Sequence, residues 1–182
     1  LNTYVEKEAC PNNLAPTSST TAQLVMGDAL AVCLLECRGF DSTDFAKFHP
    51  GGALGKQLTL KVSDIYINNE KPEISANSSI KDVIIEISSK RLGITAITEK
   101  NQLIGAVTDG DLRRMLENST NIDNLSAKDI MSTTPKTINE NEMATTALKQ
   151  MQDSNITQLI VIHEKTYLGV IHLHDLLKEG IV

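Results

Sequence analysis

Apolar positions repeat along the second half of the chain at an offset of 64 residues. In each copy the apolar residues follow the i, i+3, i+4, i+7 spacing of an amphipathic helix. They are Ile80, Val83, Ile84 and Ile87 in the first copy, and Ala144, Ala147, Leu148 and Met151 in the second. The pattern therefore predicts one amphipathic helix per copy, with its apolar side facing a core.

A strand, a turn, a strand and a helix are predicted after each of these helices. Residues 94–98 of the first copy are rich in β-branched side chains and short enough for a strand, and residues 100–101 form a polar turn. A second apolar run leads from Gly105 into a further helix, and Ile74 lies in a short segment ahead of the first one. The second copy keeps this order. The predicted fold class is therefore α/β, with two repeats of βαββα type, each about 60 residues long, packed as a pseudo-twofold pair.

The first 57 residues do not fit the repeat. Residues 3–5 predict a strand, and residues 17–20 supply helix N-cap candidates. The helix after them is expected to extend to about Arg38, with Gly39 suited to its C-cap. Its expected buried residues are Ala22, Val25, Ala29, Val32 and Leu35.

A short second helix is predicted from residues 41–44 onwards. It is expected to end at His49-Pro50-Gly51-Gly52, a sequence that cannot stay helical. The residues that follow, up to Lys56, are predicted to be a linker. This first segment is too small to be a complete domain, so we expect it to be the last part of a larger one.

Composition and charge exclude several classes of function. The chain has 182 residues, 17 Lys and Arg against 23 Asp and Glu, and a net charge of −6, with no basic block that would favour nucleic acid as a partner. Its longest clean apolar run, residues 29–35, is far shorter than the ~20 residues that span a bilayer. Three cysteines without framework spacing indicate a reducing compartment. We therefore expect a cytoplasmic protein that binds neither membrane nor nucleic acid.

The repeat resembles a pair of cystathionine-β-synthase-type (CBS) motifs from about Leu58 onwards, and the first segment resembles the end of a sugar isomerase (SIS) domain. Within the SIS superfamily the chain is similar over its whole length to the arabinose 5-phosphate isomerases, in which a SIS domain precedes two CBS motifs. The motifs that carry the resemblance are Lys7-Glu8-Ala9-Cys10-Pro11, Leu14 to Thr20, Met26 to Leu30, His49 to Gly55, Gly105 to Asp111 and Gly169 to Asp175.

This resemblance implies a domain organisation and a reaction. Residues 1–57 would be the C-terminal part of a doubly wound, flavodoxin-like SIS domain whose first two-thirds lie outside this sequence, residues 58–122 the first CBS motif and residues 123–182 the second. The parent enzyme would interconvert D-ribulose 5-phosphate and D-arabinose 5-phosphate for Kdo and lipopolysaccharide synthesis, without an organic cofactor. It would be a homotetramer that the CBS pair regulates, and the fragment alone would lack activity.

Glu8 and His49 are the candidate catalytic residues. Glu8 ends the predicted first strand, where α/β folds place their chemistry, and a carboxylate can move a proton between neighbouring carbons. His49 is held between a helix and a Pro-Gly-Gly turn, and imidazole suits proton transfer near neutral pH. The resemblance assigns both residues to the sugar-phosphate site. Without it, Glu8 reads as an exposed carboxylate and His49 as a helix C-cap.

Thr17, Ser18 and Ser19 are weaker candidates for substrate binding. Their hydroxyls and N–H groups at a helix start could meet a phosphate, although plain N-capping explains them equally. The main phosphate loop of a SIS domain would lie upstream of Leu1.

The CBS resemblance points to Thr108 and Asp111 as ligand-binding residues. In CBS motifs such a pair contacts an adenine nucleotide, the Asp at the ribose hydroxyls and the Thr near the phosphate. Asp175 matches Asp111 in the second copy, where His172 replaces the Thr and puts that site in doubt. An adenine nucleotide or a cytidine-linked sugar is the expected ligand, unless these Asp residues only cap helices. No metal site is predicted at His172 and His174.

Two other classes of function stay open. The chain could be an isolated CBS pair that senses a nucleotide or nucleotide-sugar without catalysis. A sugar-phosphate-sensing SIS transcription regulator is disfavoured, because no helix-turn-helix or basic patch is present in these residues.

Overall fold

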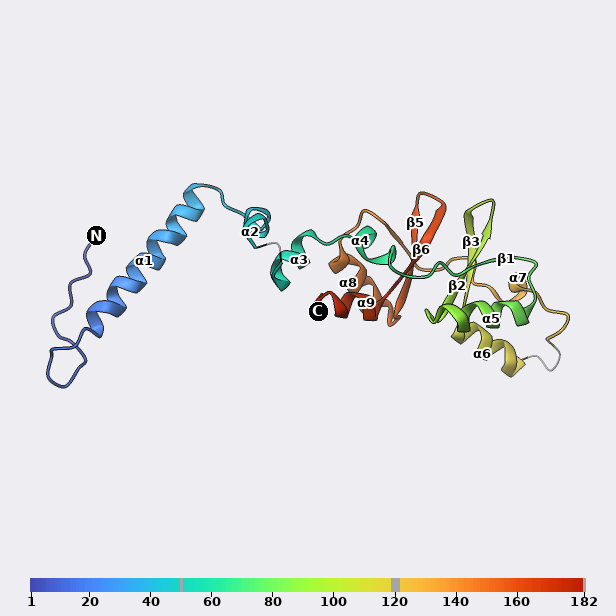
Figure 1. Ribbon diagram of the computed structural model, residues 1–182, viewed down its shortest axis with the longest axis horizontal. Coiled ribbons are helices and arrows are strands. Elements are labelled where there is room, and N and C mark those ends of the chain that lie inside the picture. Colours follow the sequence, from blue (N-terminus) through green and yellow to red (C-terminus); the bar gives the residue numbers. More distant parts are fainter. Residues whose placement is uncertain (50, 119–121, 182) are drawn as a thin grey trace. The chain divides into compact units, whose positions relative to one another are not determined.

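The structure is a computed structural model that describes residues 1–49, 51–118 and 122–181, so Pro50 of the predicted helix-ending sequence lies outside the described residues. The chain divides into two compact units, Leu1–Phe48 and His49–Val182. Figure 1 shows helices alone in the first unit and helices with strands in the second. Each unit is described by itself.

The N-terminal unit contains helix α1 (Ser18–Cys37) and helix α2 (Ser42–Phe48). Gly39 ends α1 as predicted: it has a φ of +62° and its N–H donates to the Glu36 carbonyl, while the Phe40 N–H donates to the Leu35 carbonyl. This is the Schellman arrangement, which favours glycine because it needs a left-handed residue. Asp41 caps α2, with Oδ1 accepting from the N–H groups of Thr43 at 2.8 Å and Asp44 at 3.0 Å.

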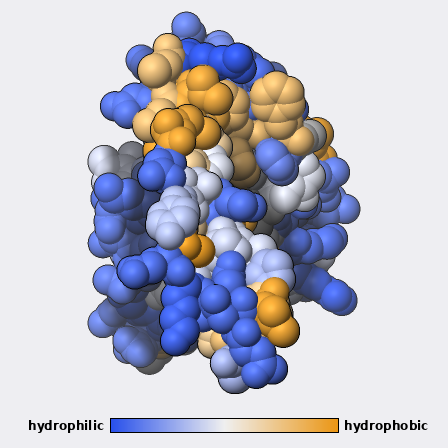
Figure 2. All heavy atoms as spheres, turned by 90° about the vertical axis from the view of Figure 1, so that its left-hand side faces the viewer, coloured by the Kyte–Doolittle hydropathy of each residue, from blue (hydrophilic) through white to orange (hydrophobic). Residues whose placement is uncertain are grey.

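Two predictions for this unit are wrong. Residues 3–5 form no strand, because a strand needs a neighbour to pair with and the described residues offer none there. The expected apolar face of α1 is not buried either: Ala22 is half-buried, and Val25, Ala29, Val32 and Leu35 are exposed. Figure 2, which views the molecule from the side of this unit, shows apolar side chains among hydrophilic ones at the surface.

Helix α1 is long and apolar enough to cross a membrane, judged by length and composition only. Its longest uninterrupted apolar run is nevertheless short, because Gln23, Gly27 and Asp28 interrupt the apolar residues. A core helix of a soluble protein passes the same test.

The second unit begins with a helix where a linker was predicted. Helix α3 (Ala53–Thr59) follows Gly52, and Lys56 on it forms an ion pair with Glu179, Nζ to Oε2 at 2.8 Å. This packing against the end of the chain stabilises a helix that its own short sequence does not predict. The prediction of a linker up to Lys56 is therefore wrong.

The remaining elements form two copies of one unit, as predicted. The first copy contains α4 (Val62–Tyr66), β1 (Glu73–Ser75), α5 (Ile80–Lys90), β2 (Ile94–Glu99), β3 (Gln102–Thr108) and α6 (Asp109–Asn118). The second contains α7 (Ala127–Ile130), β4 (Thr137–Asn139), α8 (Ala144–Ser154), β5 (Gln158–His163), β6 (Thr166–His172) and α9 (Leu173–Lys178). The predicted apolar faces of α5 and α8 are buried, except that Ile84 remains 37% exposed.

The strands form one six-stranded sheet in the order β1-β2-β3-β6-β5-β4. This order reads the same from both edges, which expresses the predicted pseudo-twofold relation of the copies. In each copy the central strands pair antiparallel and the edge strand pairs parallel. The copies meet where β3 pairs with β6, at Gln102 opposite Thr166.

A buried cluster joins the copies on one face of this sheet. It combines Ala96 and Ala106 of the first copy with Ile160, Tyr167 and Val170 of the second. The Tyr167 ring is 1% exposed, and its hydroxyl donates to the Pro72 carbonyl at 2.8 Å. Burial raises the pKa of this phenol, so it stays a neutral donor. The two copies therefore share a core on this face.

Candidate functional site

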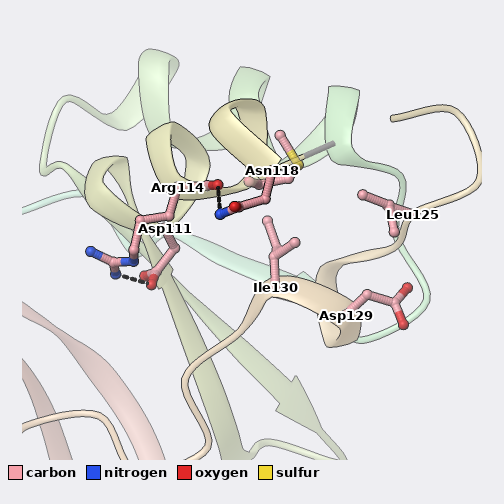
Figure 3. A pocket seen from close by; sticks show the side chains of 7 residues that line it. Asp111, Arg114, Asn118, Leu125, Asp129 and Ile130 are labelled. Atoms are coloured by element: carbon pink, nitrogen blue, oxygen red, sulfur yellow. Dashed lines mark hydrogen bonds and ion pairs between the residues drawn. The ribbon is translucent and has the colours of Figure 1, made fainter. Parts of the chain in front are cut away.

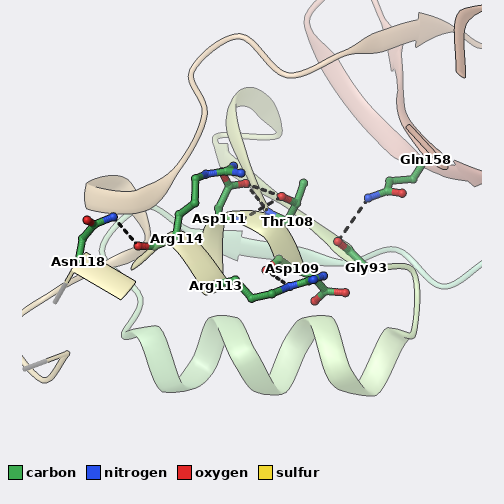
Figure 4. Close-up of polar contacts among 8 residues, drawn as sticks. All are labelled: Gly93, Thr108, Asp109, Asp111, Arg113, Arg114, Asn118 and Gln158. Atoms are coloured by element: carbon green, nitrogen blue, oxygen red, sulfur yellow. Dashed lines mark hydrogen bonds and ion pairs between the residues drawn. The ribbon is translucent and has the colours of Figure 1, made fainter. Parts of the chain in front are cut away.

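Thr108 and Asp111 meet at the start of helix α6 in the first copy. Asp111 Oδ2 accepts from the Thr108 N–H at 2.8 Å and from the Thr108 hydroxyl at 2.6 Å. The strand β3 ends at Thr108 and α6 begins at Asp109, so this carboxylate caps the helix start. Figure 4 shows the pair together with Arg114, whose guanidinium lies 2.5 Å from Asp111 Oδ1.

A cavity of about 230 Å³ opens beside this pair and draws its walls from both copies. Ala106, Thr108 and Asp111 line it from the first copy. The segment that leads into β4 covers it through Ser132, Thr134, Pro135 and Lys136, and Ile156 and Gln158 complete it. The cavity therefore combines a carboxylate and a hydroxyl with an apolar wall and one lysine, the mixed lining that suits a small polar ligand.

A second cavity lies on the other side of Asp111. Figure 3 shows Asp111, Arg114 and Asn118 on α6 facing Leu125, Asp129 and Ile130. Its volume is about 280 Å³. The Asn118 amide donates to the Arg114 carbonyl at 2.7 Å. Asp129 caps α7 through Ser126, and the Ser126 hydroxyl lowers its pKa, so this carboxylate already has a structural role.

A wider cleft of about 560 Å³ lies between the copies at the helix starts. Arg91, Thr108 and Arg113 line it from the first copy, and His172 and His174 from the second. The two imidazole rings stack with their centroids 5.0 Å apart. Burial, and then the neighbouring His174, lower the pKa of His172, so its ring is neutral at pH 7. The basic groups of this cleft could meet an anion.

The second copy differs at the matching position. Asp175 Oδ2 accepts from the His172 N–H at 2.9 Å, so it caps α9 as Asp111 caps α6. The same oxygen also accepts from the Asn69 side-chain amide at 2.6 Å. The ring of His172 stands where the first copy has the Thr108 hydroxyl, and its Nδ1 accepts from the His174 N–H at 3.1 Å. Within the described ranges, no group of three His, Cys, Asp or Glu side chains could hold a metal ion.

The structure gives Glu8 a clear local role in the N-terminal unit. Its Oε2 accepts from the backbone N–H groups of Thr17 at 2.7 Å and Ser19 at 3.2 Å, and from the Thr17 hydroxyl at 3.0 Å. Hydrogen bonds, first from the Ser19 side chain and then from the Thr17 backbone, lower the pKa of Glu8 to about 2. Glu8 is thus a carboxylate that caps α1, and it holds the N–H groups and the hydroxyl that were candidates for a phosphate.

His49 follows the last residue of α2 and is exposed. Its carbonyl accepts from the Gly52 N–H at 3.4 Å, which closes the turn ahead of α3. Glu8 and His49 belong to different compact units. Ser18 is the first residue of α1 and lines an open hollow with Thr17 and Thr20.

Sequence reasoning missed the residues that the other copy contributes to each site. Ser132 and Lys136 reach the first-copy cavity from beyond α7, and Asn69 reaches Asp175 from beyond α4. The repeat carried a signal that could have indicated these residues. The segment between the short helix and the next strand occupies the same position in both copies, so a contact made by one segment suggests a corresponding contact for the other. Their contacts nevertheless depend on how the copies fold together.

The fold and these two cap sites define a tandem CBS pair. The sequence profile of the CBS domain matches residues 62–118 and 127–181, and the chain belongs to this family. It is also 48% identical over 180 residues to the arabinose 5-phosphate isomerases KdsD of Francisella tularensis and of Escherichia coli strain K12, and 47% identical to that of Yersinia pestis. These matches confirm the predicted resemblance. They cover 98% of this chain and 55% of each relative, so the chain spans about half the length of these relatives.

Solved structures share the fold of the second unit. The CBS domain protein PAE2072 of Pyrobaculum aerophilum, complexed with AMP, has a TM-score of 0.58 at 20% identity over 64% of this chain and 90% of that one. The CBS domain pair of protein MJ0100, in complex with 5-methylthioadenosine and S-adenosyl-L-methionine, has a TM-score of 0.54 at 23% identity over 65% of this chain and 93% of that one. At these identities the likeness establishes the fold.

Proposed function

We propose that this chain is the C-terminal part of an arabinose 5-phosphate isomerase whose CBS pair binds a nucleotide-containing regulator. The parent enzyme interconverts D-ribulose 5-phosphate and D-arabinose 5-phosphate, an aldose–ketose isomerisation that moves one proton between neighbouring carbons. The identity of 48% supports this, because it extends through the residues ahead of the CBS pair as well as the pair itself. Residues 1–57 belong in this proposal to the SIS domain.

The regulatory site is the first-copy cavity, and the observation that carries it is the Thr108 and Asp111 pair on the cavity wall. Asp111 accepts the ribose hydroxyls, and the N-terminal end of α6 faces the phosphate near Thr108. The Arg114 guanidinium that now pairs with Asp111 is 67% exposed on its side chain, so a ligand displaces it at little cost. Adenine nucleotides and a cytidine-linked sugar acid are the candidate ligands.

Calorimetric titration with AMP, ATP and a cytidine-linked sugar acid tests this site. Replacing Asp111 with Ala removes the ribose acceptor and is expected to weaken binding by roughly 10- to 100-fold, which corresponds to about 1.5–3 kcal/mol for a hydrogen bond to a charged group. Asp175→Ala is the matched control, because it removes the corresponding helix cap from the second copy. No binding at millimolar ligand, or equal losses in both variants, would contradict the assignment.

Catalysis in the parent enzyme is assigned to Glu8 and His49. The low pKa of Glu8 keeps its carboxylate ionised. To act as a base, this carboxylate has to exchange its hydrogen bonds from Thr17 and Ser19 for contact with the substrate. In the full-length parent, Glu8→Gln and His49→Ala are each expected to lower kcat by roughly 100-fold. The measurement is the isomerase rate of each variant, and near-normal rates in both would refute the assignment. Cytoplasmic location, a homotetramer and lack of activity in the fragment are parts of the same proposal.

An isolated CBS pair that senses nucleotides without catalysis is the alternative. The wide polar cleft between the copies favours it, since this cleft needs no SIS domain. One assay distinguishes the two functions. The chain is joined to the N-terminal part of a relative, and only a chain that belongs to an isomerase restores isomerase activity or its regulation. The transcription-regulator alternative has no specific observation in its favour.

A further inference from the structure

The segments that connect the short helix to the edge strand differ in length between the copies. Ile65 to Ile74 spans one residue more than its counterpart, Ile130 to Ile138. The extra residue is taken up by turns that continue α4, in which the Asn68 N–H donates to the Ile65 carbonyl and the Asn69 N–H to the Tyr66 carbonyl. The additional turn determines where the Asn69 side chain lies.

The two segments then approach the sheet in different ways. Ser132, in the segment of the second copy, pairs through its backbone with Ala106 of the first, with its N–H donating at 2.9 Å and its carbonyl accepting at 3.0 Å. In the second copy the Asn69 side chain takes over this contact, because its amide donates to the Val170 carbonyl at 3.0 Å. Val170 is the residue that matches Ala106 at the repeat offset.

The same amide nitrogen also contacts the predicted ligand acceptor. Asn69 Nδ2 lies 2.6 Å from Asp175 Oδ2, so its two protons are used by Val170 and Asp175. An NH₂ group on a carboxylate oxygen supplies the hydrogen bond that a ribose hydroxyl would otherwise supply. In the first copy no such amide is bound to the matching carboxylate among the described residues. Asp111 instead contacts Thr108 and the exposed Arg114, and the cavity beside it is open.

We propose that Asn69 occludes the second nucleotide site by occupying Asp175 as an internal ligand. This rests on the proposed function of the first site and extends it: the chain binds one nucleotide, in the first copy, and Asn69 blocks the matching position at Asp175. Asn69 is half-buried and short, so freeing Asp175 from it breaks two hydrogen bonds at once, whereas Arg114 leaves Asp111 by moving only an exposed side chain. Asn69 therefore sets the stoichiometry of the module.

Calorimetric titration of the 182-residue chain with AMP tests this proposal. Asn69→Ala removes the amide and is expected to raise the stoichiometry from one to two, with at least tenfold tighter binding at the second site. Asn68→Ala is the matched control, because the Asn68 amide donates to the Asp64 and Ile65 carbonyls of α4, whereas the Asn69 amide donates to Asp175. Thermal melting establishes that both variants are folded.

Three further variants separate the possible outcomes. In an Asp111→Ala background, Asn69→Ala is expected to restore one site, and Asp175→Ala to remove it again. Two sites in the unmodified chain, or a second site that appears with His172→Thr and not with Asn69→Ala, overturns the proposal. If the unmodified chain binds no AMP and Asn69→Ala binds one, the occlusion stands and the first-site assignment fails. If no variant binds, both fail.

Discussion

Thr95 is a buried hydroxyl that the fold leaves without a partner. It is the second residue of β2, is 0% exposed, and its Oγ1 has no hydrogen-bond partner among the described residues. Its side chain faces Val107 of β3 across the sheet. The second copy has Leu159 at this position, also 0% exposed, opposite Ile171. Replacing Thr95 with Val keeps the branched shape and removes the unsatisfied group.

The expected gain follows from two contributions. A buried hydroxyl without a hydrogen bond costs about 1–3 kcal/mol, and exchanging it for a methyl group adds roughly 0.5–1 kcal/mol of apolar burial. The free energy of unfolding should therefore increase by about 1.5–4 kcal/mol. At about 2–4 °C per kcal/mol, that corresponds to a rise in Tm of roughly 3–16 °C.

Thermal melting and urea unfolding of Thr95→Val measure this gain. Thr98→Val is the control on the same strand, since the Thr98 hydroxyl donates to Glu73 Oε1 at 2.6 Å and its loss should lower stability by about 1 kcal/mol. A Tm for Thr95→Val that is unchanged or lowered would refute the reasoning, because it would mean that the hydroxyl is hydrogen-bonded in solution.

Further expectations concern the sheet, the core and the first helix. A Cβ on Gly105 would lie 2.8 Å from the Ser132 carbonyl, which is backbone and cannot move aside, so Gly105→Ala should lower Tm by several degrees in thermal melting. Tyr167→Phe removes one of the two hydrogen bonds that the Pro72 carbonyl accepts, while the Ala96 N–H still donates to it, so the variant should cost about 1 kcal/mol in urea unfolding. Glu8 has a pKa lowered from 4.5 to about 2, so its stabilisation of α1 is present above pH 4.5 and is lost as the pH falls through 2. Circular dichroism should show this loss of helix in the native chain and not in Glu8→Gln, and parallel curves would contradict it.

The repeat could be predicted because its signals are local. Apolar spacing of 3.6 residues, as in Val83 and Ile87 on α5, and β-branched runs such as β2 depend only on neighbours along the chain. Gly39 was likewise predictable, since a helix that ends in a left-handed residue selects glycine. The Thr108 and Asp111 pair belongs to the same class, because Thr108 ends the strand and Asp111 lies three residues later in the first turn of the helix.

Local pattern failed where the outcome depends on a distant partner. Val25 has helical spacing and yet is exposed, since burial requires a surface to pack against and the described residues place none over it. Lys56 lies in a helix where the local sequence predicts a linker, and it pairs there with Glu179 from the far end of the chain. Asn69 occupies Asp175 across more than a hundred residues, a contact that no spacing along the chain indicates. Local periodicity and capping thus account for the elements and the two cap sites. The Asn69 contact that distinguishes the second cap site from the first was decided by the tertiary structure, because it forms only when remote segments are packed together.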